Sequence, residues 1–375
     1  MKDENTPAQT MINTVCGVKR NERVLIIANP ETDGIAQKLF EAARAVRARP
    51  VLIFQPAKKS FDNAAHEVLA AIASNPDVCL SISAVKLGKD PEGIAHPYKD
   101  DRNIEYDHIF DYLLYGKKSI RAVWTPGITP SMYERTVQID YEELARRCTV
   151  LEGLYENAVS VHVTAPGGTD VTVPVNGRKV LCDNGVFSRP GTGGNIPSGE
   201  VFISPVVGTG NTRNQHTTVC GTSGTIVFDG SMTFGDGDAL LKTPITVHVD
   251  EGFVKEITGG SEALRLEKTI HDAETNAVSM EKEGRLPAGM GSVYSRNARN
   301  IGELGIGLNP SAVITGNMLE DEKAFRTCHF AIGENYDSDA PSLIHLDGVV
   351  RDPTISITYA DSSRKIILRS GEIQF

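Results

Sequence analysis

Residues 23–55, with the sequence RVLIIANPETDGIAQKLFEAARAVRARPVLIFQ, decide the fold class of the first half of the chain. The apolar run at 23–28 predicts a strand, and apolar residues spaced three or four positions apart predict a helix over 35–48. A second strand is predicted at 51–55. A strand, a helix and a strand in succession indicate parallel strands joined by a right-handed crossover. We therefore expect an open, mostly parallel α/β domain of Rossmann-like type over residues 1–150.

The turn after the first predicted strand argues against a nucleotide site in this domain. Its sequence, ANPETDG at 28–34, lacks the glycine spacing of dinucleotide- and phosphate-binding loops. Without those glycines the backbone cannot approach a pyrophosphate closely. His66, His96 and the pair Asp107-His108 have no second motif partner, so surface or helix-cap roles are favoured for them.

The second half of the chain, 151–375, has a different pattern. Alternating runs such as VSVHVT at 159–164 and VTVPV at 171–175 are separated by a Pro-Gly-Gly turn and predict antiparallel strands. Few helices are predicted, the longest over 262–282, and the polar stretch near Asn211 is predicted to be a loop. We expect an α+β, β-rich catalytic domain here.

Charge and composition limit the function classes. The 375 residues include 48 acidic and 38 basic ones, for a net charge of −10, which argues against nucleic acid or an anionic membrane as a partner. No apolar run approaches the roughly 18 residues of a membrane-spanning helix. The N-terminus has no apolar core of a signal peptide, and the six cysteines form no CxxC pair. These features predict a cytoplasmic protein with reduced thiols.

Four short stretches of the second half place chemically active side chains among apolar residues and glycines. Glu200 follows a Pro-Ser-Gly turn, Glu303 stands between glycines and aliphatic residues, and His329 lies in a strand-like run. His345 and Asp347 are two positions apart, so in a strand both would point to the same face. Carboxylates and imidazoles buried together need a cation, and this set suits two divalent ions per subunit, such as zinc, cobalt or manganese. Two ions about 4 Å apart activate a shared water, which predicts hydrolase chemistry.

The runs NIPSGEVFISP, GELGIGLN, HFAIGENY and IHLD, in this order, resemble the thermophilic-type metallo-aminopeptidases, the aminopeptidase T, aminopeptidase S and PepS family. The resemblance spans the second half well and the first half only as a general α/β domain. It implies a homodimer that releases N-terminal residues from short peptides. The metal ligands that it implies are Glu200, Glu303, His329, Tyr336, His345 and Asp347.

The resemblance also assigns catalytic roles. Glu303 is the candidate base that takes a proton from the bridging water. Tyr336 either ligates one metal or donates a hydrogen bond to the tetrahedral oxyanion. The expected activity is therefore metal-dependent hydrolysis of the N-terminal peptide bond.

Two other interpretations remain. Ring-cleaving iron dioxygenases that act on dihydroxypyridines share this scaffold, and His329, His345 and Asp347 would supply their two-histidine, one-carboxylate triad. Glu200 and Glu303 favour two metals, because a mononuclear iron site does not need them. The other is a non-catalytic protein with a structural metal, which is disfavoured because structural zinc sites prefer cysteine and the motifs contain a single one.

Overall fold

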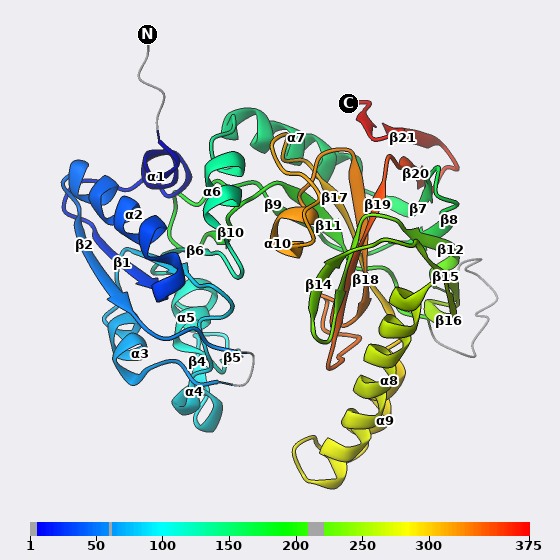
Figure 1. Cartoon of the computed structure of the whole chain (residues 1–375), viewed down its shortest axis with the longest axis horizontal. Helices are drawn as coiled ribbons and strands as arrows, with labels where there is room; N and C mark the ends of the chain where they lie inside the picture. The colour runs from blue at the N-terminus through cyan, green and yellow to red at the C-terminus, as the bar shows by residue number, and fades with distance from the viewer. Residues whose placement is uncertain (1–5, 60–61, 209–220) are drawn as a thin grey trace. The chain divides into compact units, whose positions relative to one another are not determined.

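The computed structural model describes residues 6–59, 62–208 and 221–375, so the predicted loop near Asn211 lies outside the described residues. The chain divides into two compact units (Figure 1). The first comprises Met1–Ala145, Asp183–Ser198 and Asn309–Ala312; the second comprises Arg146–Cys182, Gly199–Leu308 and Val313–Phe375. The domain boundary at residue 150 stays a prediction.

The first unit contains a five-stranded sheet in the order β10-β6-β3-β1-β2, and all neighbouring strands in it are parallel. Its strands are β1 (Arg23–Ala28), β2 (Arg49–Phe54), β3 (Val78–Ile82), β6 (Arg121–Trp124) and β10 (Gly193–Asn195). The predicted parallel α/β fold is confirmed. One element was missed: β10 comes from the second half of the sequence and is a short run of Gly-Gly-Asn without strand-like alternation.

Helices of the first unit pack their apolar residues toward this sheet. On α2 (Asp33–Ala45), Ile35, Leu39 and Ala43 are buried, as the sequence spacing predicts. The remaining elements are α1 (Pro7–Gln9), α3 (His66–Ala73), α4 (Pro91–Ala95), α5 (Ile109–Asp111), α6 (Pro130–Thr136), two π-helices (Thr10–Val15 and Tyr112–Gly116), a 3-10 helix (Pro30–Thr32) and the hairpin of β4 (Tyr98–Lys99) and β5 (Glu105–Tyr106). The first residues of α7 (Tyr141–Leu154) belong to this unit and the rest to the second.

Two larger sheets form the second unit. The seven-stranded sheet has the order β14-β13-β19-β18-β17-β11-β9 and the eight-stranded sheet the order β16-β15-β12-β8-β7-β20-β21-β22. The first consists of β9 (Val180–Asp183), β11 (Glu200–Ile203), β13 (Ser231–Phe234), β14 (Gly237–Leu240), β17 (Ile301–Gly307), β18 (Thr327–Gly333) and β19 (His345–Arg351). The second consists of β7 (Ala158–Thr164), β8 (Asp170–Pro174), β12 (Ser223–Phe228), β15 (Ile245–Asp250), β16 (Phe253–Thr258), β20 (Thr354–Tyr359), β21 (Arg364–Arg369) and β22 (Glu372–Ile373).

Strands β11, β17, β18 and β19 lie side by side and pair antiparallel. Every residue of β17 and β18 is buried, and so are most of those in β11 and β19. The predicted β-rich second half is therefore confirmed. Any charged residue within these four strands is inside the protein and needs a partner there.

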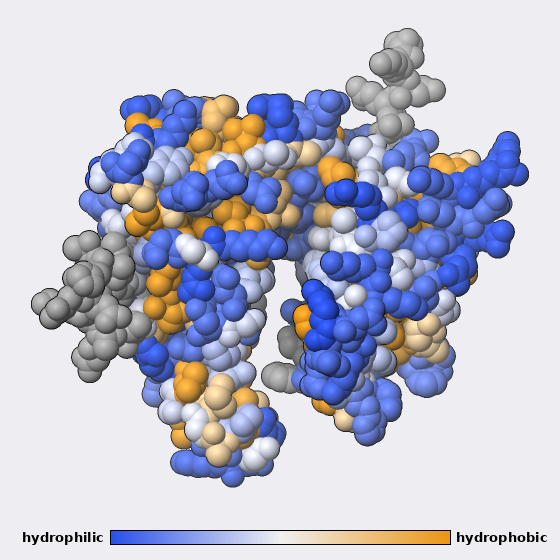
Figure 2. Space-filling model, turned by 180° about the vertical axis from the view of Figure 1, so that it is seen from behind, coloured by the Kyte–Doolittle hydropathy of each residue, from blue (hydrophilic) through white to orange (hydrophobic). Residues whose placement is uncertain are grey.

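Outside the sheets, α8 (Ser261–Lys282) and α9 (Met290–Asn297) form a helical hairpin (Figure 1). The predicted helix over 262–282 matches α8 to within one residue. Hydrophilic residues predominate on the face shown in Figure 2, with apolar residues in small groups between them. In the described residues, no helix combines the length and apolar character needed to cross a membrane.

Candidate metal centre

The five predicted histidine and carboxylate ligands lie on the four central strands of the seven-stranded sheet, each opposite a glycine or an alanine. The pairs are Glu200 with Gly307, Glu303 with Ala331, His329 with Gly305, Asp347 with Ala331 and His345 with Gly333. Because the opposing residues fill so little space, the long side chains can converge over the sheet. The alternation of ligand and small residue is what the sequence runs GELGIG and HFAIG encode.

Two of these glycines allow close approaches that a larger residue would prevent. A Cβ atom at Gly305 would lie 2.0 Å from Nε2 of His329, so the imidazole packs directly on the β17 backbone. A Cβ atom at Gly307 would lie 2.1 Å from the carbonyl oxygen of Ala324. That second contact holds the segment before β18 against the sheet, next to Glu200.

Glu303 connects the two imidazoles. Its Oε1 lies 3.1 Å from Nε2 of His329, and its Oε2 lies 3.1 Å from Nε2 of His345. Nε2 of His329 is also 3.7 Å from Oε2 of Glu200, and Nε2 of His345 is 3.3 Å from Oδ1 of Asp347. Residues from four strands thus form one continuous cluster.

Within the described part of the chain, three sets of side chains bring their ligand atoms within 4.8 Å of one another. Each set contains one histidine and two carboxylates. The sets are Glu200, Glu303 and His329; Glu303, His345 and Asp347; and Glu322, His329 and Asp347. The triad His329, His345 and Asp347, which the dioxygenase interpretation assembled from sequence, is not among the sets found in these described residues.

Tyr336 lies beside the cluster. Its ring meets that of His345 edge to face, with 5.3 Å between the ring centroids, and that of Phe202 in the same manner at 5.0 Å. Desolvation of the hydroxyl, followed by the negative charges of Glu303 and Asp347, raises the pKa of the Tyr336 phenol well above its usual value. The hydroxyl therefore keeps its proton and can donate a hydrogen bond.

Sequence reasoning missed two members of the cluster, Glu322 and Lys323, which directly follow α10 (Met318–Asp321). The Lys323 side chain is fully buried, and its Nζ lies 3.1 Å from Oε1 of Glu200. It also forms an ion pair with Glu322. Both residues belong to the charged run EDEK, which resembles a solvated surface segment. The only signal in the sequence was the position of this run, a few residues before the buried strand that carries His329.

Burial and the contacts among the cluster residues shift the pKa values of these residues in opposite directions. Burial raises the pKa of Glu200 to about 8, although Lys323 opposes that shift. For Glu303 burial acts in the same direction, but hydrogen bonds from His329 and His345 outweigh it and lower the pKa to about 2. Burial alone would lower the pKa of His329, yet its contact with Glu303 raises it to about 9. Glu303 is therefore ionised, whereas Glu200 and His329 retain protons easily.

Three features of the cluster fit a divalent cation. Nδ1 of His345 donates to the carbonyl oxygen of Glu334 at 2.9 Å, so Nε2, which faces Glu303 and Asp347, is the ring nitrogen that can bind a cation once that cation displaces its proton. Oδ1 of Asp347 is buried without a hydrogen-bond partner. The cluster also holds more carboxylates than permanent cations, since the Lys323 ammonium contacts Glu200 and Glu322, whereas Glu303 and Asp347 contact histidines.

Comparison with known proteins places the chain in a different enzyme class from the one predicted. A family model described as NicX, 2,5-dihydroxypyridine 5,6-dioxygenase, matches residues 130–358, a range that includes the whole cluster. The structure of a 2,5-dihydroxypyridine dioxygenase from Pseudomonas putida KT2440 has a TM-score of 0.67 and 19% identity, covering 98% of this chain and 96% of that one. AmpT from Thermus thermophilus has a TM-score of 0.64 and 16% identity, covering 98% of both chains. No curated protein matches the chain.

The predicted metallo-aminopeptidase activity is wrong, because the family model is that of a dioxygenase, an oxidoreductase rather than a hydrolase or protease. The resemblance to aminopeptidases holds for the fold, which AmpT shares. The prediction of two metals relied on Glu200 and Glu303 both needing a metal cation. That count omitted Lys323, whose ammonium already lies beside Glu200.

Proposed function

Because this chain belongs to the 2,5-dihydroxypyridine 5,6-dioxygenase (NicX) family, we propose that it is a non-haem iron(II) dioxygenase that opens the ring of a dihydroxypyridine. The observation that carries the proposal is the family match over residues 130–358. Every member of the buried histidine and carboxylate cluster lies inside that range, so the matched segment contains a complete candidate metal centre.

The proposed iron ligands are Glu303, His345 and Asp347. These side chains form one of the converging sets, and they include the imidazole whose Nδ1 is held by a backbone carbonyl, so that its Nε2 faces both carboxylates. Imidazole and carboxylate together suit ferrous iron. When bound, ferrous iron supplies the redox chemistry that lets dioxygen react with an aromatic ring.

A single ion follows from the cations that the chain itself provides. Lys323 forms ion pairs with Glu200 and Glu322, and burial raises the pKa of Glu200 to about 8, so Glu200 needs no metal cation to offset its charge. The Glu200 side of the cluster is thereby neutralised without metal. One ferrous ion on the His345 side replaces the two zinc, cobalt or manganese ions expected from the sequence.

The aromatic residues beside the cluster suit a planar substrate. Phe202 and Tyr336 meet edge to face next to His345, so a ring can pack against them and remain near the ligands. Tyr336 donates a hydrogen bond from its protonated hydroxyl to a ring oxygen of the substrate. In this proposal it orients the ring and does not ligate the metal.

The test is oxygen consumption by the full chain. Metal-free protein is loaded anaerobically with ferrous iron, mixed with 2,5-dihydroxypyridine and exposed to air-saturated buffer. We expect one dioxygen to be consumed for each ring opened, with loss of the aromatic ultraviolet absorbance. The matched controls are the metal-free protein and the zinc-loaded protein, both of which should be inactive. Oxygen uptake no faster than in these controls would contradict the proposal.

The predicted homodimer stays a prediction. Sedimentation of the full chain would test it, with a mass of twice 40.5 kDa as the expected result. Short peptides are no longer expected as substrates, since that expectation depended on aminopeptidase activity.

A further inference from the structure

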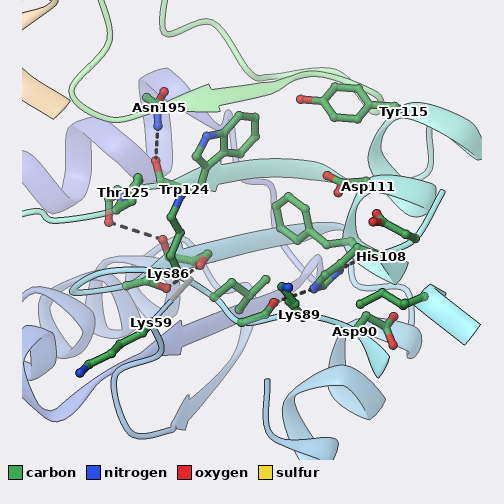
Figure 3. A pocket seen from close by; sticks show the side chains of 18 residues that line it. Lys59, Lys86, Lys89, Asp90, His108, Asp111, Tyr115, Trp124, Thr125 and Asn195 are labelled. Atoms are coloured by element: carbon green, nitrogen blue, oxygen red, sulfur yellow. Dashed lines mark hydrogen bonds between the residues drawn. The ribbon is translucent and has the colours of Figure 1, made fainter. Parts of the chain in front are cut away.

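A cavity of about 730 Å³ is lined entirely by residues of the first unit. Its floor is formed where parallel strands end: Ser81 and Ser83 at β3, Trp124 and Thr125 at β6, and Asn195 at β10 (Figure 3). The carboxyl ends of parallel strands are where open α/β sheets bind their ligands, and the volume lies within the range of small-molecule pockets.

The loop after β3 forms one wall of this cavity, and two buried amides hold it in place. Asn29 accepts a hydrogen bond from the Ala84 backbone N–H at 2.7 Å and donates to the carbonyl oxygen of Gln55 at 2.9 Å. The Gln55 side chain donates to the carbonyl oxygen of Leu87 at 2.7 Å. These bonds occupy the sheet edge above β1, where a glycine-rich loop would otherwise hold a phosphate, and leave the cavity over β3, β6 and β10.

One end of the cavity combines an aromatic surface with positive charge. Figure 3 shows Trp124 and Lys86 at this end, and the Trp124 ring meets that of Phe110 edge to face with 6.0 Å between centroids. Lys59 and Lys86 both line the cavity and are exposed. Among the residues the structure describes, no salt bridge involves Lys86, whose exposed ammonium can contact a ligand.

The acidic residues that line the cavity, unlike Lys86, do not offer charge to a ligand at the Trp124 end. Asp90 accepts hydrogen bonds from the backbone N–H groups of Gly93 and Ile109 and from the Tyr98 hydroxyl, so it organises the surrounding loops. Asp111 lies at the far end from Trp124, near His108 (Figure 3). His108 caps α5 through Nδ1 and donates from Nε2 to the carbonyl oxygen of Gly88. Lys86 is the charged lining residue drawn at the Trp124 end, whereas the Lys59 side chain extends away from it (Figure 3).

We propose that this cavity binds a small planar aromatic anion, with its ring against Trp124 and Phe110 and its anionic group toward Lys86. Aromatic side chains supply the flat apolar contact, and the ammonium group supplies the charge. Two kinds of molecule have this chemistry, an aromatic carboxylate and a nucleoside monophosphate. The proposal does not depend on the reaction at the metal centre.

Trp124 makes the test direct, because it is the only tryptophan in the chain. All indole fluorescence of the full-length protein therefore comes from the cavity. We expect either benzoate or adenosine monophosphate to change that fluorescence with saturation, and the probe that saturates identifies the source. The uncharged counterparts, benzamide and adenosine, should bind at least about fivefold more weakly, because they lack the charge that an exposed lysine recognises.

A pair of variants locates the contact. Lys86→Ala should weaken binding of the anionic probe about fivefold and leave that of its uncharged counterpart unchanged. Lys19→Ala removes an exposed lysine of the same unit that does not line the cavity, and it should change neither. The proposal is overturned if no probe gives saturable binding, if charged and uncharged probes bind equally, or if the two variants behave alike.

Discussion

The two units of this protein use their buried polar side chains in opposite ways. In the α/β unit, Asn29 and Gln55 are buried, and each makes its hydrogen bonds to backbone groups of neighbouring loops. In the β-rich unit, Glu303 and His329 are just as deeply buried but contact other ionisable side chains. A buried polar side chain that makes its hydrogen bonds to backbone groups holds a loop in place. A buried cluster with more carboxylates than cationic side chains can instead bind a cation.

This difference also explains why glycine matters more in the second unit. The contacts around Gly305 and Gly307 bring a histidine and a lysine onto the sheet, so these positions shape the metal centre directly. In the first unit, the amide side chains of Asn29 and Gln55 hold the neighbouring loops in place through hydrogen bonds. If the comparison is right, changes to the buried ionisable cluster of the second unit alter metal binding, and changes to the buried amides of the first unit alter stability without altering metal binding.

The largest effect is expected for His345→Ala, which removes the imidazole facing Glu303 and Asp347. Loss of a partner that only orients a ligand costs 10–100-fold in metal affinity, so loss of the ligand itself should weaken iron binding by more than about 100-fold and stop oxygen uptake. Iron content after dialysis and an oxygen electrode measure both. His248→Ala, an exposed histidine on β15, is the matched control. Retained iron and activity in the His345 variant would contradict the proposed ligand set.

Lys323→Met tests how many ions the centre holds. Wild-type protein should bind one ferrous ion per chain, and the variant should bind two, because Glu200 then lacks its ammonium partner. Without metal the variant should be less stable by about 3 kcal/mol, the usual cost of breaking a buried ion pair. Elemental analysis and urea unfolding measure these quantities. Lys323→Arg keeps the charge and should still bind one ion; two ions in the wild type, or one in the methionine variant, would count against the role given to Lys323.

Asn29→Ala tests the other side of the comparison. It leaves the N–H of Ala84 and the carbonyl oxygen of Gln55 without their buried partner, which should cost about 2 kcal/mol of stability. Trp124 fluorescence during urea unfolding reports on this unit alone, since the chain has no other tryptophan. The number of ions bound should stay at the wild-type value. A change in the number of bound ions would contradict the inference that the buried amides of the first unit do not affect metal binding.

The smallest expected effect concerns pH and the ion pair of Glu22 with Arg121, in which two N–H···O contacts measure 3.1 and 2.6 Å. Burial would raise the pKa of Glu22, but the hydrogen bonds from Arg121 outweigh it and lower the pKa. A lowered folded-state pKa means that the pair stabilises above the unfolded value of about 4.3 and that this stability is lost as the pH falls through the folded value.

Comparing wild type with Glu22→Gln between pH 7 and pH 3 measures this contribution. The wild type should lose no more than about 1 kcal/mol beyond the loss of the variant, since water screens the exposed side of Glu22. Equal losses in both proteins would show that the pair contributes nothing to the acid sensitivity of the first unit.

Local sequence patterns predicted most elements and the composition of the site, but not its electrostatic balance. The predicted strand at 23–28 coincides with β1, and the alternating run at 159–164 lies within β7, because the pattern that predicts a strand is a local property. The cluster residues Glu200 and His345 were singled out because motifs of glycines and aliphatic residues surround them. Lys323 was missed, since nothing local distinguishes a buried lysine in EDEK from a solvated one.

The sequence by itself determined that an α/β half precedes a β-rich half and which histidines and carboxylates are close to one another along short motifs. The tertiary structure decided how these motifs combine. Antiparallel pairing of β11, β17, β18 and β19 places Glu303 between two imidazoles, and the close approach at Gly307 places an ammonium against Glu200. Residues more than a hundred positions apart set each other's charge, because the energy of a buried ion depends on its neighbours in space and not on those along the chain.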